Sequence, residues 1–349
     1  MTAASRSAVL ATVAGLAAGW LAAMLLVWLY GESPRAIALQ LVTGTWAVPY
    51  GVGQVLYKAT ALLLTGVAVD LALRAGLFNI GAEGQLAVAG LAVAGTAAGL
   101  PATTPAWIAL PTALATAALA GAAWAVVPMV LRVRYHGHEV ISTIMMNRVA
   151  DALVAFCLAR GMALPGTVRT ADAIPATHLP RLDAVGLRAL HGSSVSAALP
   201  LAVGVTACVA VWLRRSRIGR EVVLVGMSPR ACEAAHIPVG RRLGVALLVS
   251  GAIAGLAAAG PVLGNKGYFE SGLGAGAGFG GIAVALIGRG HPVGLGLAAL
   301  LFGTLDQGGL AINGRVPMEV VTVVQGVVIA AVALADARIR AVALRGVTS

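Results

Sequence analysis

The chain is poor in charged and aromatic residues. Of its 349 residues, only 11% are charged and 5% are aromatic, whereas 59% are hydrophobic. A soluble domain carries about 25% charged residues, so this chain lacks the polar residues that a water-exposed surface requires. The scarcity of aromatic residues also argues against a membrane β-barrel, which needs aromatic girdles. The composition therefore predicts an all-α, polytopic membrane protein whose helices face lipid or one another.

The motifs of common enzymes and metal sites are also missing. Neither Lys58 nor Lys266, the two lysines, precedes Ser or Thr, so the chain has no G-x-x-x-x-G-K-[ST] phosphate-binding loop. The cysteines Cys157, Cys208 and Cys232 form no metal-binding spacing with one another or with the scattered histidines. We therefore expect no catalytic residue, no metal and no cofactor in this chain. A membrane enzyme with unfamiliar residues stays a remote alternative.

Long apolar segments take the place of these motifs. A helix needs about 20 apolar residues to cross a bilayer. The first segment is too long for the core of a signal peptide and has no convincing cleavage site, so we expect an uncleaved span. The sequence predicts one transmembrane bundle over residues 1–349 with about ten spans, at 9–30, 59–73, 84–100, 106–131, 139–159, 195–213, 242–262, 276–288, 293–310 and 318–335.

The net charge of +11 follows the pattern of a membrane topology. With ten spans, fifteen of the 24 Lys and Arg residues lie on the side of both termini, and eight lie on the other side. Because basic residues stay in the cytoplasm, we expect cytoplasmic termini and a cytoplasmic loop at 214–242. The segment 160–194 becomes an extracytoplasmic loop, either a connector or a docking site for a partner. Nucleic acid is not an expected partner, since no soluble domain carries the arginines.

Two stretches interrupt the apolar pattern with glycine. The first is 76–85, and the second runs from 272 to 296. Broken helices at membrane depth are tolerated where protein or a watery cavity receives the freed backbone groups. Paired interruptions in the two halves of a transporter also point to its pathway. We therefore expect broken helices, and we expect spans 2–5 and 7–10 to form related halves.

Polar side chains inside the spans mark candidate pathway residues. Such groups are costly in a bilayer and usually face an interior or a cavity, although helix–helix contacts are the competing interpretation. Neutral amides suit a polar, uncharged solute, because they donate and accept hydrogen bonds without holding a charge. For Arg148 and Asp151, an internal ion pair competes with a role in transport. The other polar residues in or beside the spans are Asn79, Glu83, Gln85, Asn147, Asp306 and Gln325.

The cytoplasmic loop contains a predicted short helix at 226–237. Ser228 is a suitable N-cap, and Pro229 suits the first helical position. A short surface helix between two spans has no packing reason of its own. It either lies on the bilayer surface or fits a groove in a cytosolic partner.

Four stretches resemble the permease subunits of nucleoside-type ABC importers, within the wider group of ribose and branched-chain amino-acid permeases. They are the run Arg74–Gln85, the run His138–Asn147, the loop helix and the run Gly280–Arg289. Gln325 in the last span also fits. The resemblance extends over about 70–340, and its first motif is specific because ribose and amino-acid relatives differ there.

The resemblance implies a site and a set of partners. It makes Phe78, Asn79, Glu83, Gln85, Asn147 and Gln325 the pathway candidates, with Phe78 either stacking on a base or serving as a core aromatic. It makes the loop helix a coupling helix, with Gly226, Ser228, Pro229, Glu233, Ala234 and Ala235 in an ATPase groove. The partners it implies are a cytosolic ATPase that binds the ATP, a substrate-binding protein and a second permease, of which this chain looks like the longer paralogue.

The function that follows is inward transport of nucleosides by alternating access, across a bacterial cytoplasmic (inner) membrane. Two rival interpretations stay open. One is an ABC permease for a pentose or another small polar solute. The other is an ion-coupled secondary transporter, which would need no ATPase.

Overall fold

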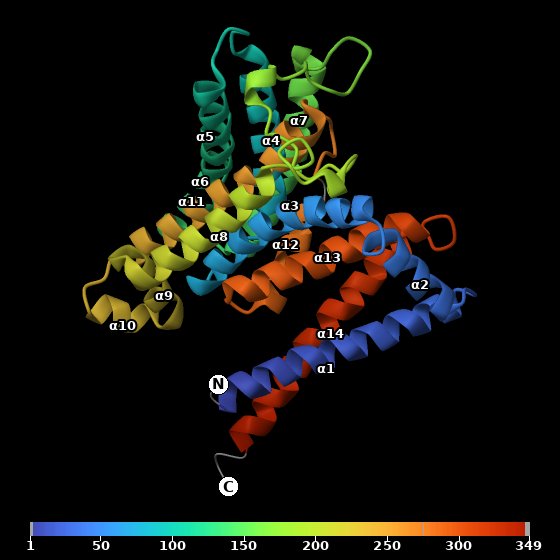
Figure 1. Cartoon of the computed structure of the whole chain (residues 1–349). Coiled ribbons are helices and arrows are strands. Elements are labelled where there is room, and N and C mark those ends of the chain that lie inside the picture. The colour runs from blue at the N-terminus through green and yellow to red at the C-terminus, as the bar shows by residue number, and fades with distance from the viewer. Residues whose placement is uncertain (1–2, 275, 346–349) are drawn as a thin grey trace. The chain divides into compact units, whose positions relative to one another are not determined.

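The computed structural model describes residues 3–274 and 276–345, and helices dominate this part of the chain (Figure 1). Pairing of β type in the described residues is limited to three isolated bridges, and the all-α prediction is confirmed. The helices are α1 (Ala3–Leu29), α2 (Pro34–Thr45), α3 (Pro49–Arg74), α4 (Ala82–Gly99), α5 (Ala106–Trp124), α6 (Val126–Tyr135), α7 (Glu139–Cys157), α8 (Ala198–Arg215), α9 (Arg217–Met227), α10 (Pro229–Ala234), α11 (Val239–Leu256), α12 (Ala277–Gly288), α13 (Pro292–Ile312) and α14 (Met318–Arg345).

Each of the ten predicted apolar segments coincides with helix. Six helical stretches among the described residues are long and apolar enough to cross a membrane, and α1 with α2 makes a seventh candidate that is bent by 116° at a break. The six are Pro49–Arg74, Ala106–Tyr135, Glu139–Met162, Ala198–Arg215, Val239–Lys266 and Pro292–Ile312. This number is below ten because the chain also uses shorter apolar helices, such as α12.

The chain forms two compact units, residues 56–299 and residues 1–55 with 300–349, and each is described by itself. In the larger unit α3 and α11 are central: 83% and 67% of their apolar windows are buried. The corresponding share is 22% for α5–α6, for α7 and for α8. These outer helices therefore present apolar faces to lipid or to other subunits.

Small residues let the helices of the larger unit approach closely. Gly121 of α5 lies against Gly251 and Gly255 of α11, where an added Cβ would meet backbone atoms. Gly66 of α3 lies against the side chain of Val284 of α12, which an added Cβ would overlap. In lipid the hydrophobic effect does not draw helices together, so close backbone packing of this kind supplies much of the attraction.

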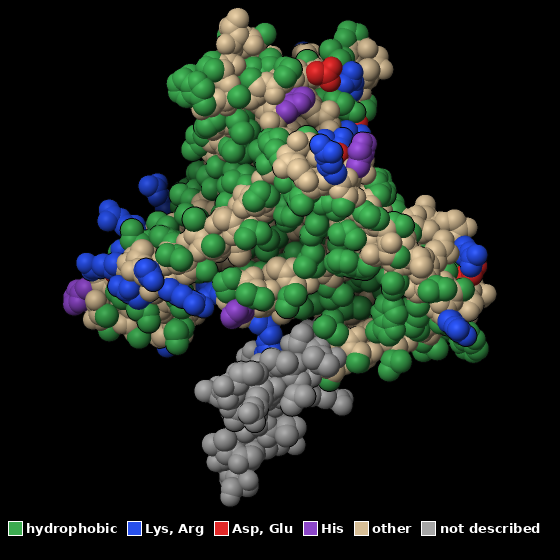
Figure 2. Space-filling view, in the orientation of Figure 1, with side chains coloured by type: hydrophobic (Ala, Val, Ile, Leu, Met, Phe, Trp, Pro, Cys, Tyr) green, Lys and Arg blue, Asp and Glu red, His purple; other side chains and the backbone are tan. Residues whose placement is uncertain are grey.

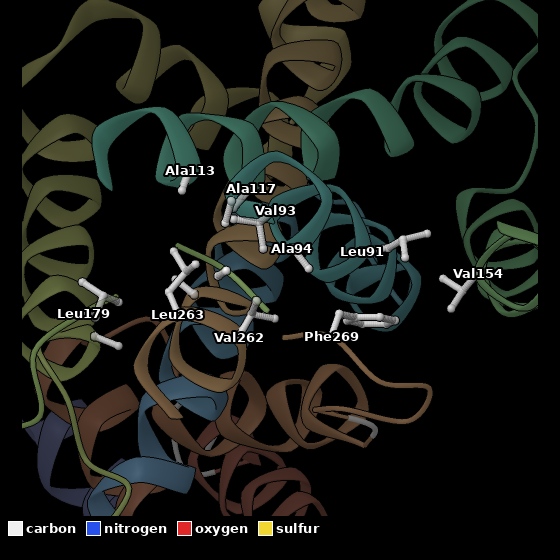
Figure 3. Close-up of a cluster of buried hydrophobic side chains, with 14 of the residues drawn as sticks. Leu91, Val93, Ala94, Ala113, Ala117, Val154, Leu179, Val262, Leu263 and Phe269 are labelled. Carbon is white, nitrogen blue, oxygen red and sulfur yellow. The ribbon is translucent and has the colours of Figure 1, made fainter. Parts of the chain in front are cut away.

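A buried hydrophobic cluster joins α4, α5, α7 and the loops beyond them (Figure 3). Phe269, only 2% exposed, lies in it with Leu91 and Leu263. The segment 160–194, predicted as an extracytoplasmic loop, is tied to this region by backbone hydrogen bonds, including Thr170 N to Phe269 O at 2.8 Å and Leu179 N to Leu263 O at 2.9 Å. The segment is thus bonded to the core, which a loose connector would not require.

The smaller unit packs α1 along α14. Gly19 faces Val328, whose Cα lies 2.9 Å from the position of an added Cβ. A second contact joins α2 to α13, where Gln40 Nε2 donates to Ala311 O at 2.8 Å. The apolar core of this unit consists of Val27, Ile37, Ile312, Val316 and Val321.

Candidate functional site

The first predicted interruption begins where α3 ends. Leu77 N donates to Ala72 O at 3.0 Å, and Gly76 N donates to Leu73 O at 3.0 Å. This pair of bonds is a Schellman motif, which needs a left-handed residue, and Gly76 supplies it with φ of 73°. The following Leu77 is buried. The predicted break at 76–85 is confirmed, and the glycine at its start explains why the helix ends there.

Two amides hold the broken segment inside the protein. Asn79 and Gln85 are 0% and 1% exposed, and Asn79 Nδ2 donates to Gln85 Oε1 at 3.0 Å. The same nitrogen donates to Ser250 Oγ of α11 at 2.8 Å, and Ser250 Oγ donates to Ala68 O of α3 at 2.6 Å. One polar network therefore ties the break to α3, α4 and α11. Sequence reasoning found the amides but missed Ser250, which looks like an ordinary residue of an apolar span.

Asn147 pins the other side of the break. Its Oδ1 accepts from Gly84 N, and its Nδ2 donates to Ile80 O, both at 3.0 Å. One side chain of α7 thereby satisfies a donor and an acceptor that the interruption frees. Since a buried amide without partners is costly, this match fixes the register of α7 against α4.

Glu83 joins the first interruption to the second. Its Oε1 accepts from Gly276 N at 2.7 Å, and its Oε2 accepts from Gly278 N at 2.8 Å. The carboxylate therefore caps the start of α12, where the partial positive charge of a helix favours an anion. The second interruption, predicted at 272–296, is confirmed on both sides of α12.

The remaining pathway candidates, Phe78 and Gln325, are not members of this network. Phe78 is half-buried in the break. Gln325 belongs to the smaller unit, where its Nε2 donates to Asp306 Oδ1 at 2.6 Å. That these residues line a pathway stays a prediction.

The Arg148–Asp151 pair lies on the outside of the chain. The two charges are 3.6 Å apart on α7, and their side chains are 82% and 62% exposed. The predicted ion pair therefore forms within α7, but it faces outward on this chain and is not buried inside it. The reason is the direction of α7, which turns Asn147 inward and its neighbour Arg148 outward.

The end of α3 receives contacts from two further segments. Arg74 Nε donates to Asp70 Oδ2 at 2.8 Å, and Arg74 Nη2 donates to Gly290 O in the turn after α12. Gly226 of α9 lies against the backbone of Arg74 and Ala75, and it faces Gly76. The break after α3 is thus in direct contact with the segment that precedes α10.

The loop 214–242 contains a helix that sequence reasoning missed. Glu221 of α9 is buried, and its carboxylate accepts from Arg217 Nε at 2.8 Å and from Arg242 Nε at 2.5 Å. These bonds fasten α9 to the start of α11. Two signals predict the helix in retrospect: the i,i+4 pair Arg217–Glu221 and apolar residues at helical spacing, with Val222 and Val225 buried.

The ion pairs of Glu221 should make the stability of the folded chain depend on pH. Hydrogen bonds from Arg217 and then Arg242 hold the pKa of the Glu221 carboxyl below its ordinary value. Because the folded state favours the ionised form, the stabilisation is complete above the ordinary pKa and is lost as the pH falls through the lowered one. We expect the melting temperature of the detergent-solubilised protein to exceed that of Glu221→Gln near neutral pH. The gap should begin to narrow below the ordinary glutamate pKa of about 4.3 and shrink further as the pH falls, and a gap independent of pH contradicts this role.

The short helix in the loop forms as predicted but is shorter. Ser228 caps α10, its Oγ accepting from Ala231 N at 3.3 Å, and Pro229 is the first helical residue. The helix ends at Ala234, with Ala235 as its C-cap, and Gly226 belongs instead to α9. All of α10 is exposed except Cys232, and basic side chains gather over this end of the larger unit (Figure 2).

Three relatives match this chain over most of its length. A guanosine ABC transporter permease protein of Bacillus subtilis (strain 168) is 36% identical over 333 residues, which cover 93% of this chain and 91% of the relative. A glucose ABC transporter permease protein of Haloferax volcanii is 34% identical over 328 residues, covering 92% and 85%. A nucleoside ABC transporter permease protein of Lactococcus lactis subsp. cremoris is 28% identical over 330 residues, covering 92% and 89%.

Residues 51–333 match the family described as the branched-chain amino acid transport system / permease component. This range holds both interruptions, the network of Asn79 and Gln85, the Glu83 cap and α10. The chain therefore belongs to this family of transport permeases.

Proposed function

We propose that this chain is the membrane-spanning permease subunit of an ATP-driven importer for nucleosides. The observation that carries the proposal is the likeness to the guanosine permease, which is 36% identical over 93% of this chain. The Lactococcus relative supports it, because its substrate class is also nucleosides.

The partners follow from what the chain lacks. Its sequence has no phosphate-binding loop, so ATP is bound and hydrolysed by separate cytosolic ATPase subunits. A substrate-binding protein delivers the nucleoside, and a second permease completes a heterodimer. The chain crosses the bacterial cytoplasmic membrane several times with both termini in the cytoplasm, as its Lys and Arg distribution favours.

The exposed α10 is the element that contacts the ATPase. Its Glu233 and Ala234 are exposed, and so is Ala235, which follows the helix. Met227, just before the helix, is 77% exposed. An apolar side chain this exposed beside a short capped helix suits a protein groove. Movement of the ATPase would reach the break after α3 through the contact between Gly226 and Gly76.

The interruptions supply the parts that move. The Glu83 cap and the Arg74–Gly290 bond hold α12 at its two ends. Alternating access requires contacts that differ between two states. We propose that these two contacts belong to one state and are exchanged when α10 is displaced.

A sugar is the second candidate substrate, because the Haloferax relative is a glucose permease at 34% identity. Uptake of labelled guanosine by cells expressing the complete importer separates the two. We expect competition by unlabelled nucleosides and none by ribose or glucose. Competition by a sugar alone rejects the nucleoside assignment.

Glu233→Arg tests the docking of α10. The change reverses a charge on an exposed residue without touching the packing of α9 or α11, so insertion and expression should be normal. We expect uptake to fall about tenfold, since a misplaced charge at a protein interface costs several kcal/mol. Arg230→Lys, which keeps the charge on the same helix, is the control. Unchanged uptake in Glu233→Arg contradicts the assignment.

A further inference from the structure

An exposed ion pair lies near the middle of a membrane-spanning helix. Arg148 and Asp151 belong to the span Glu139–Met162, and their side chains are 82% and 62% exposed. With a rise of about 1.5 Å per residue, they lie roughly 13–18 Å from the start of the helix. Charged side chains at this depth are costly against acyl chains and usually face a bundle interior or a water-filled cavity. This face of α7 therefore requires a polar environment in the assembled importer.

The pair lies beside the junction of the two interruptions. Asn147 of α7 accepts from Gly84 N at 3.0 Å, which places the first turn of α4 against this part of α7. Asp151 follows one helical turn after Asn147, and its neighbour Ala150 also lies against Gly84, the residue after Glu83. Both Glu83 carboxylate oxygens already accept hydrogen bonds, from Gly276 N and Gly278 N. Glu83 therefore has a structural role here, and the Arg148–Asp151 pair is left to contact a solute.

An exposed aromatic ring belongs to the same junction. Phe279 lies in the first turn of α12, is 51% exposed, and directly follows Gly278, whose N donates to Glu83. An aromatic side chain can stack on any planar base, whatever its identity. A guanidinium group donates hydrogen bonds to hydroxyl and carbonyl oxygens, and a carboxylate accepts them from hydroxyl groups. The opposite charges of Arg148 and Asp151 cancel, which matches an uncharged solute.

We infer that Phe279, Arg148 and Asp151 form a station for the solute within the conduit, the ring taking the base and the ion pair taking the hydroxyl groups of the sugar. This inference rests on the proposed function for the identity of the solute. It adds Phe279 as a ligand and gives the Arg148–Asp151 pair a specific role in transport, which the sequence analysis left open.

Thiol labelling tests whether water reaches the station and whether the solute binds there. In the complete importer, with the three native cysteines replaced and uptake retained, Asp151→Cys should react with a charged, membrane-impermeant methanethiosulfonate. Saturating guanosine should slow that reaction. Val203→Cys, at an exposed apolar position of α8, is the control and should not react, because a thiol in lipid is not ionised. An Asp151→Cys variant that does not react overturns the inference, and means that lipid or the second permease covers this face of α7. Labelling that guanosine does not slow also overturns it.

Transport kinetics test the aromatic ring. Loss of one base–aromatic stack should raise the KM for guanosine about tenfold in Phe279→Ala, with the maximal rate little changed. Phe279→Trp should restore the low KM, which a merely structural role for Phe279 would not predict. An unchanged KM in Phe279→Ala overturns the station. Absence of nucleoside uptake by the parent importer refutes the proposed function instead.

Discussion

Gly226→Ala is expected to abolish nucleoside uptake. The added Cβ would overlap Arg74 O and lie 2.8 Å from the carbonyl carbon of Ala75. Both neighbours are backbone atoms at the end of α3, so they do not swing aside as a flexible side chain does. Overpacking of this kind costs about 1–3 kcal/mol. We expect this cost to push α9 away from the break, which disconnects α10 from the segment that it moves.

Two measurements separate uncoupling from misfolding in Gly226→Ala. The variant should reach the membrane and copurify with its ATPase, while ATP hydrolysis no longer responds to the loaded binding protein. Gly204→Ala in α8 is the matched control, since an added Cβ there meets no atom within 4 Å. Normal uptake by Gly226→Ala would show that the contact between α9 and α3 carries no movement.

Glu83→Ala is expected to cause the second large loss. The change removes the acceptor of Gly276 N and Gly278 N, and each hydrogen bond to a charged group contributes about 1.5–3 kcal/mol. Because Gly276 is exposed, water replaces part of that contribution. A net loss of about 1.4 kcal/mol already corresponds to a factor of ten in an equilibrium. We expect uptake to fall about tenfold or more, together with a lower melting temperature.

The series at position 83 distinguishes the cap from a simple charge effect. Glu83→Gln keeps one acceptor oxygen in place and should retain more uptake than Glu83→Ala. Glu319→Ala is the control, because Glu319 also lies in the first turn of a helix and is exposed. Equal loss in Glu83→Gln and Glu83→Ala would indicate that the negative charge matters and the cap does not.

The four substituted residues act on two different parts of the chain. Gly226 and Glu83 act on the two segments that interrupt the helices, whereas Glu221 and Glu233 act on the loop that we propose as the docking site of the ATPase. The first pair should therefore change transport through the permease itself. The second pair should change stability of the loop or its docking, and transport only as a consequence.

The sequence by itself determined the class of the protein and the position of its breaks. Apolar segments of bilayer length have only one stable secondary structure in lipid, because every backbone group must be paired within the segment. Gly76 tolerates the left-handed conformation that ends a helix, and Ser228 before Pro229 favours the start of one. These are local properties of the chain, so they are readable without a fold.

Only the tertiary structure decided what the polar residues do. Asn79 binds Gln85 and also Ser250, which lies 171 residues from Asn79 in the chain. Glu83 caps a helix that begins almost 200 residues later. Such pairings depend on how α3, α4, α11 and α12 pack, and packing between distant segments leaves no periodic signal in the sequence. For the same reason, the outward direction of Arg148 and Asp151 became visible only when Asn147 fixed the rotation of α7.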